Sequence, residues 1–165
     1  MSSAGNFTLQ PLGVIHTPHQ NPELTPTQPC FARHIRGEIH LDGGLTEGLK
    51  GIHGFSHLHL VYLLHQAKPG PLVARPYLTD EPMGVFACRV AERPNTLGLS
   101  VVRLLAVEGN RLIIEDVDML DGSPLLDIKP YYPKADRPEG AWGGWTEEVP
   151  PQDADHRGRR QPKHG

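Results

Sequence analysis

The chain has 165 residues, a formal net charge of −3 at pH 7, and 38% hydrophobic and 21% charged residues. This length suits one domain with a hydrophobic core, and the charge excludes polyanion binding held by bulk positive charge alone. The 18 glycines and 17 prolines exclude an architecture of long helices. Cys30 and Cys88 are too few for a disulfide framework and predict a reducing, cytoplasmic location, and no apolar run could span a bilayer.

The first quarter of the chain predicts two strands separated by a loop. Phe7 to Thr17 predicts a first strand interrupted by proline and glycine, and residues 18–30 form a proline-rich loop. Phe31 to Leu41 alternates apolar and polar residues, which is the period of a half-buried strand. Gly43 to Gly51 holds one helical turn at most.

Phe55 to Gln66 is the most apolar segment, and it predicts a central strand buried on both faces. A loop with four prolines follows over residues 68–82, and Met83 to Val90 predicts another strand. The apolar runs Val101 to Val107 and Leu112 to Val117 predict a hairpin, because Glu108-Gly109-Asn110 between them accepts a tight turn. About six or seven short strands favour a mainly β fold, a single small β-barrel with short helical turns and a C-terminal tail.

The hairpin brings two polar loops to the same end. The first is R-P-N-T-L-G-L-S (93–100), and the second is D-M-L-D-G-S-P-L-L-D-I-K-P-Y (118–131). Loops with a rigid backbone and exposed polar groups are common places for functional sites. A candidate site is therefore expected where these two loops meet.

The predicted domain boundary falls after residue 136. Residues 1–136 form the barrel, and residues 137–165 form a Pro/Gly-rich, basic tail in which Arg157 to Gly165 carries no acidic residue. This basic run is either a mobile solvated tail or a flexible arm that contacts phosphates, and both interpretations stay open. Trp142 and Trp145 are expected to anchor the start of the tail on the barrel.

Familiar catalytic motifs are missing from the sequence. The histidines at 53, 57, 59 and 65 invite a metal hypothesis, but no third ligand stands at a zinc spacing, so no metal is predicted. Cys88 lies in an apolar strand and is expected to be an inert core thiol. The chain contains no G-x-S-x-G, P-loop or G-x-G-x-x-G motif, which argues against a Rossmann nucleotide site.

The two loop motifs resemble those of the TrmO (TsaA-like) family, and the resemblance covers Pro11 to Lys134. It implies a β-barrel methyltransferase that uses S-adenosyl-L-methionine to methylate N6 of threonylcarbamoyladenosine beside the anticodon of tRNA. It also implies a homodimer with the cofactor near the subunit interface. The alternatives are a methyltransferase of the same fold that acts on a small molecule, and a non-catalytic cofactor- or RNA-binding barrel.

The resemblance implies specific site residues. The cofactor-binding positions are Gln28, Pro29, Cys30, His65, Gln66, Arg89, Leu99, Met119, Leu120, Asp121 and Gly122. The apolar members can pack the adenine or the methionine chain, and Asp121 can accept from ribose or attract the sulfonium. Thr27 and Cys30 depart from the family's arginine and glycine, which puts the tRNA preference in question.

The remaining polar motif residues have two interpretations. Asn95 and Asp127 are the catalytic candidates, because methyl transfer to nitrogen requires help in removing a proton. Arg93, Lys129 and Tyr131 are the substrate-binding candidates. The structural alternative is that Arg93 pairs with Asp127 only to pin the two loops together.

Overall fold

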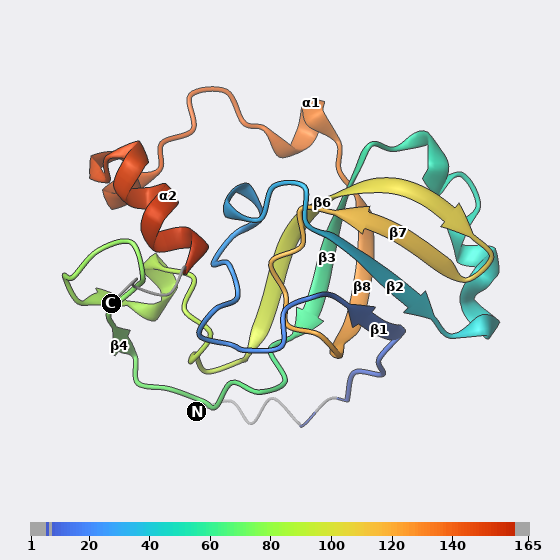
Figure 1. Ribbon diagram of the computed structural model, residues 1–165, viewed down its shortest axis with the longest axis horizontal. Helices are drawn as coiled ribbons and strands as arrows, with labels where there is room; N and C mark the ends of the chain where they lie inside the picture. The colour runs from blue at the N-terminus through green and yellow to red at the C-terminus, as the bar shows by residue number, and fades with distance from the viewer. Residues whose placement is uncertain (1–5, 7, 161–165) are drawn as a thin grey trace.

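The computed structural model describes residue 6 and residues 8–160, and its centre is a closed antiparallel barrel. Around the barrel the strands follow the order β1-β2-β7-β6-β3-β8, and β8 closes onto β1 (Figure 1). Their bounds are β1 Gly13–His16, β2 Arg36–Leu41, β3 His57–Leu63, β6 Leu97–Glu108, β7 Arg111–Glu115 and β8 Ser123–Pro130. The predicted mainly β, single-barrel fold is confirmed.

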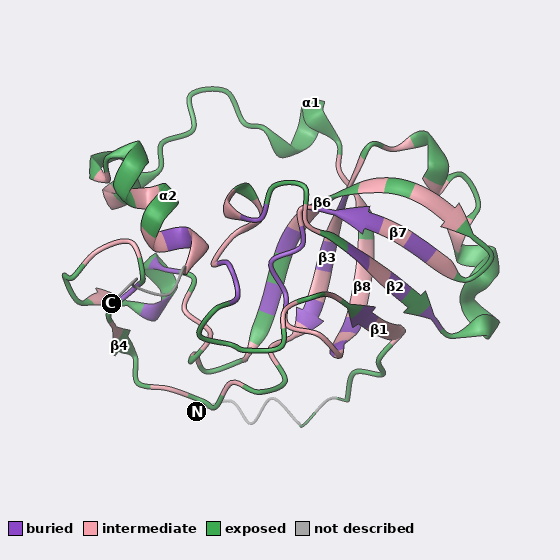
Figure 2. Cartoon of the chain, in the orientation of Figure 1, coloured by how far each residue is buried: buried purple, intermediate pink, exposed green. Residues whose placement is uncertain are grey.

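The core fills the interior of this barrel. It contains Ile15, Ile39, Leu41, Leu58, Leu60, Tyr62, Val102, Leu112, Ile114, Val117, Met119 and Leu125. In β3 every second residue is buried, whereas His57, His59 and Val61 between them are only half-buried (Figure 2). The prediction that this strand is buried on both faces is therefore wrong, because the outer face of the barrel strand has no second layer packed fully against it.

The predicted hairpin is confirmed by β6 and β7, which turn at Gly109 with φ 64°. The two strands differ in length, 12 residues against 5. The first half of β6 pairs with β3, and only the second half pairs with β7. The chain after β7 is thus free to turn back across the first half of β6.

Several shorter elements differ from the prediction. β1 begins at Gly13 instead of Phe7, which itself lies outside the described residues. Of the predicted strand Met83 to Val90, only Met83–Gly84 is a strand (β5), paired with β4, Val73–Ala74. Val85–Ala87 then forms the 3-10 helix η4, because the buried residues Val85 and Cys88 stand three apart, the spacing of a helical turn.

The other short helices lie in the connections and in the C-terminal segment. They are η1 Pro29–Phe31, η2 Gly43–Leu49, η3 Ile52–Gly54, α1 Pro133–Asp136, η5 Gly144–Glu148 and α2 Pro151–Arg159. With 7 residues, η2 exceeds the single turn that the sequence predicts for Gly43 to Gly51. No described helix is long and apolar enough to cross a membrane.

The C-terminal segment packs back on the molecule (Figure 1). Trp145 Nε1 donates to the carbonyl of Ala87 at 2.8 Å, which confirms one predicted anchor, whereas Trp142 is 81% exposed and anchors nothing. The basic residues Arg157 and Arg159 pair with Asp80 and Asp155. Residues 157–160 of the basic run lie in α2 and at its C-terminal end, so for them the prediction of a mobile tail is wrong. Contact of this run with phosphates stays a prediction, and residues 161–165 lie outside the described residues.

Candidate functional site

The candidate site residues converge on one end of the barrel. β3 ends at Leu63, two residues before His65, and it pairs there with Leu97 at the start of β6. β8 begins at Ser123, beside the D-G-S-P turn. In Figure 1 the connecting segments and α2 lie beside the barrel on the side where β6 begins. Strand ends and loops that are distant in sequence therefore share one region.

Gln28 and Arg89 meet directly in this region, although they stand 61 residues apart. The Arg89 guanidinium donates to the side-chain carbonyl of Gln28 at 2.5 Å. Cys30, two residues further on, is exposed as a whole, but its thiol is partly withdrawn from water, and this raises the thiol's pKa. The thiol is therefore a neutral group at pH 7, which does not suit a nucleophile.

A buried polar chain crosses the same end of the barrel. The Tyr62 hydroxyl lies 3.1 Å from Ser100 Oγ, and Ser100 Oγ donates to Asp118 Oδ1 at 2.6 Å. Burial raises the pKa of Asp118 to about 7, while the Ser100 hydrogen bond and the charge of Arg89 act in the opposite direction. Burial and the Asp118 charge raise the pKa of Tyr62, so its hydroxyl stays protonated. Asp118 thus titrates near neutral pH at the edge of the site.

The D-G-S-P turn is held against the end of β1. Asp121 Oδ1 accepts from the Thr17 backbone N–H at 3.0 Å and lies 3.3 Å from His16 Nδ1. These contacts, led by the Thr17 hydrogen bond, lower the pKa of Asp121. Gly122 has φ 78°, a conformation that favours glycine, and its N–H donates to the carbonyl of Ile15 at 2.9 Å. Asp121 therefore holds this turn in place, whatever else it contacts.

His65 and Ser123 connect the turn to the end of β3. Ser123 Oγ lies 3.5 Å from His65 Nδ1 and donates to the carbonyl of Leu120 at 2.7 Å. Met119 is 1% exposed and belongs to the core, so its side chain packs inside the barrel beneath the loop surface and anchors the turn to the core. The other three cofactor candidates in this turn, Leu120, Asp121 and Gly122, are more accessible than Met119.

A second group of candidates lies on the outer face of the barrel. Leu99 and Asp127 both pair with Val61. Lys129 pairs with His59, two residues nearer the start of β3. Tyr131 follows, and its N–H donates to the carbonyl of His57. Leu99 is 57% exposed, and Asp127 Oδ2 lies 3.0 Å from Lys129 Nζ. These residues form a stripe along the outside of the barrel, which separates Tyr131 from the loop cluster.

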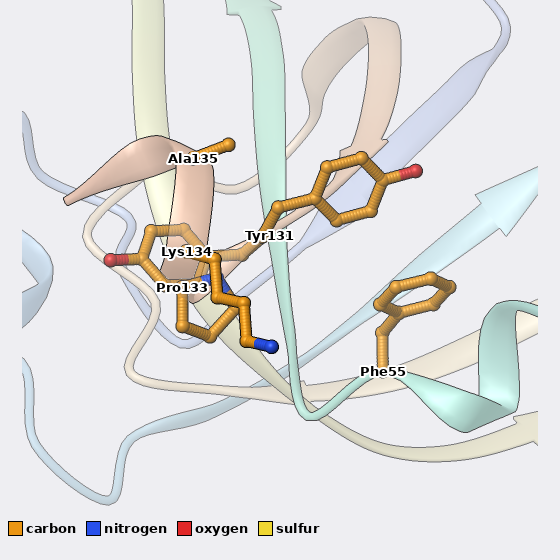
Figure 3. Close-up of a pocket in the computed structure, with 6 residues that line it drawn as sticks. Phe55, Tyr131, Pro133, Lys134 and Ala135 are labelled. Carbon is orange, nitrogen blue, oxygen red and sulfur yellow. The ribbon is translucent and has the colours of Figure 1, made fainter. Parts of the chain in front are cut away.

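Tyr131 lines an apolar depression at the far end of this stripe. Figure 3 shows residues that line this depression, among them Phe55, Tyr131, Pro133 and Lys134. The Phe55 ring lies 5.7 Å from that of Tyr132, and Tyr131 lies 5.4 Å from His59. Tyr131 thus belongs to an aromatic cluster at the opposite end of β3 from His65.

Arg93 and Asp127 do not form the pairing that the structural alternative proposes. The Arg93 guanidinium donates to the backbone carbonyls of Cys88 and Val90, at 3.1 and 3.5 Å, and so braces its own loop. Asp127 pairs with Lys129 instead. Asn95 is exposed beside this loop, and the N–H of Leu97 donates to its carbonyl at 2.7 Å.

The histidines on β3 and the one just after it have separate partners. His57 lies next to Ser56, His59 Nε2 lies 3.1 Å from Asp136, and His65 lies near Ser123. Within residues 6 and 8–160 no group of three or more His, Cys, Asp or Glu residues could hold a metal ion.

Sequence reasoning missed the chain Tyr62–Ser100–Asp118. Asp118 is the first residue of the second loop motif (118–131), and Ser100 is the last residue of the first (93–100). No role was predicted for either residue. A usable signal existed, because Asp118 interrupts an apolar run directly after a buried strand, where an ionisable side chain must find partners.

The architecture defines the class of this protein: a small closed β-barrel whose site is built from loops at one end, without Rossmann βαβ units. Residues 14–137 match the family described as the tRNA-methyltransferase O N-terminal domain, and the chain belongs to this family.

Relatives of known name support this membership. A Pyrococcus abyssi protein named as a probable S-adenosyl-L-methionine-binding protein is 48% identical over 138 residues, covering 84% of this chain and 75% of the relative. The tRNA (adenine(37)-N6)-methyltransferase of Escherichia coli is 34% identical over 155 residues, covering 88% of this chain and 66% of the enzyme.

A crystal structure of TrmO from Pseudomonas aeruginosa superposes with a TM-score of 0.75 at 37% identity, covering 92% of this chain and 66% of that one. The chain therefore spans about two thirds of the length of the E. coli enzyme and of the crystallised protein.

Proposed function

We propose that this protein is an S-adenosyl-L-methionine-dependent tRNA adenine-N6 methyltransferase whose substrate base is threonylcarbamoyladenosine beside the anticodon. The observation that carries the proposal is the Gln28–Arg89 contact within a chain matched to the tRNA-methyltransferase O family over residues 14–137. The family resemblance assigns both residues to the cofactor. They are distant in sequence, and they form a hydrogen bond with each other at the loop end of the barrel.

The residues at this end suit a ligand that is both cationic and aromatic. A buried carboxyl with a raised pKa, such as Asp118, becomes more stable in its ionised form when a cation lies near it. Leu99, 57% exposed on the adjoining outer face of the barrel, offers apolar surface to an adenine ring. When bound, S-adenosyl-L-methionine supplies an electrophilic methyl group on a positively charged sulfur.

The chain's own residues bind, orient and accept a proton in this proposal. Gln28, Arg89, His65 and Gln66 provide hydrogen-bonding groups around the cofactor, and the turn from Met119 to Gly122 closes beside it. Asn95 orients the acceptor nitrogen, and the Asp127 carboxylate accepts the proton that nitrogen loses. Arg93, Lys129 and Tyr131 contact the RNA. Close placement of the two reactants supplies most of the rate gain expected of such a site.

The same geometry supports a homodimer. Lys129 and Tyr131 lie on the outer face of the barrel, toward the opposite end of β3 from the loop cluster. A two-fold axis across that face would place Tyr131 of one subunit near Leu99 of the other. Each site would then draw its cofactor residues from one subunit and substrate contacts from both.

The test compares methyl acceptors. Labelled S-adenosyl-L-methionine is incubated with the protein and with tRNA that carries threonylcarbamoyladenosine, with the matching unmodified transcript, and with a metabolite extract. We expect label in the modified tRNA alone. If neither RNA accepts a methyl group while the protein still binds the cofactor, the tRNA proposal fails. Label in the metabolite extract would then favour the small-molecule alternative.

A further inference from the structure

The segment from Trp145 to Arg160 lies outside the family-matched residues 14–137, yet it reaches the candidate site. It contains most of η5 and all of α2, and in Figure 1 α2 lies against the connecting segments rather than against the strands of the barrel. Its contacts fall on the chain immediately beside Gln28 and Arg89.

The Gln28 side of the site rests on Gly158. The Thr27 N–H donates to the Gly158 carbonyl at 2.9 Å, and the Thr27 hydroxyl donates to the same oxygen at 3.4 Å. Gly158 is buried against Phe31, and a Cβ there would come within 2.3 Å of the Phe31 ring. Thr27 and Phe31 flank the stretch Gln28–Cys30. Through Gly158, α2 therefore contacts the residues at both ends of this stretch.

The Arg89 side is held by Trp145. Its indole N–H donates to the carbonyl of Ala87, two residues before Arg89, at 2.8 Å. Further along the segment, Arg157 forms a two-point contact with Asp80, at 3.0 and 3.1 Å. The Arg160 guanidinium lies 4.0 Å from the centre of the Tyr77 ring. Both Asp80 and Tyr77 belong to the chain that leads into Arg89.

We propose that residues 145–160 act as a clasp that positions the Gln28–Arg89 pair, and so sets cofactor affinity without touching the cofactor. This inference rests on the proposed cofactor site. A single exposed hydrogen bond between two long side chains does not by itself fix two loops relative to each other. The clasp supplies that fixation, because Gly158 and Trp145 form hydrogen bonds with the backbone of Thr27 and Ala87.

The decisive variant is Gly158→Val, which forces α2 away from Phe31. The matched control is Arg159→Ala, whose partner Asp155 lies within α2 itself. Two measurements are made on each full-length protein: hydrogen exchange of the amides over residues 27–32, and cofactor affinity by calorimetry. In Gly158→Val we expect the Thr27 amide to lose protection and the dissociation constant to rise on the order of tenfold, with neither change in the control.

A second pair of variants tests the proposal if Gly158→Val does not fold. Trp145→Phe removes the single N–H donor to Ala87, and Trp142→Phe alters an 81% exposed ring. We expect weaker cofactor binding, by about threefold to tenfold, only in Trp145→Phe. The clasp is refuted if the folded variants keep wild-type exchange and affinity. If the wild-type protein binds no cofactor while exchange still responds to Gly158→Val, the proposed function fails and the positioning role stands.

Discussion

At the scale of single residues, Asp118 makes the protein's stability depend on pH. Its folded pKa of about 7 lies above the ordinary value of ~3.9. Its contribution to stability is therefore complete below pH ~3.9 and is lost as pH rises through 7, because the unfolded chain releases this proton more readily. Carboxylates with lowered pKa, such as Asp121 and Asp136, titrate below this window.

We therefore expect the wild-type protein to lose stability relative to Asp118→Asn between pH 5 and pH 8, by at most about 1.4 kcal/mol per pH unit. The asparagine retains a carbonyl oxygen that accepts from Ser100, so the hydrogen bond is kept while the titration is removed. Urea unfolding at several pH values measures the difference. Parallel pH profiles for the two proteins would show that Asp118 is not the titrating group.

Residue identities in the site could be predicted where a side chain belongs to a linear motif. Gln28 and Arg89 were assigned in this way, and the structure brings them together. What the sequence could not provide is which contacts each residue makes. Asp121 is bonded to Thr17, and Arg93 to the carbonyls of its own loop, because these contacts depend on how the loops are folded in three dimensions.

At the scale of elements, the pairing of β3 with β6 depends on a glycine. Gly98 stands opposite Tyr62, and a Cβ on Gly98 would lie 2.3 Å from the Tyr62 ring. The ring fills the space that a side chain at position 98 would need, and this brings the Tyr62 hydroxyl to Ser100. The glycine of the R-P-N-T-L-G motif therefore shapes the buried end of the site.

Gly98→Ala should lower the free energy of unfolding by about 1–3 kcal/mol, the usual cost of overpacking. Gly48→Ala is the control, because no atom lies within 4 Å of a Cβ at Gly48, which belongs to the exposed helix η2. Chemical denaturation of the three proteins provides the comparison. Equal stability of the two variants would contradict the packing argument.

Element prediction succeeded where apolar and polar residues alternate, as in β2 and in the β6–β7 hairpin. It failed for the C-terminal segment because a high content of glycine, proline and charge was interpreted as a tail. The signals of a helix were nevertheless present: Pro151 at the start, Asp153 in the first turn, and Arg157 and Arg159 in the last. Contact with Phe31, which sequence alone could not reveal, completes α2.

At the scale of the whole molecule, the outer face of β3, β6 and β8 is the surface on which a second copy is expected to dock. Leu97 is 42% and Leu99 57% exposed on this face, beside the half-buried Val61 and Leu63. Isologous dimers bury an apolar centre with polar residues around it, and here His59 and Lys129 continue the same stripe.

We expect light scattering to report twice the chain mass of 18.2 kDa for the wild-type protein at micromolar concentration. Leu97→Asp should shift the protein to monomer, because a carboxylate would be buried without a partner in the interface. Leu72→Asp is the matched control, since Leu72 is 65% exposed and lies outside the barrel strands. If the dimer brings Tyr131 to the partner's cofactor site, the Leu97→Asp monomer should also lose methyl transfer to tRNA. A monomeric wild-type protein would instead require each subunit to bind its RNA with Lys129 and Tyr131 remote from the methyl donor, and the shared-site arrangement would be wrong.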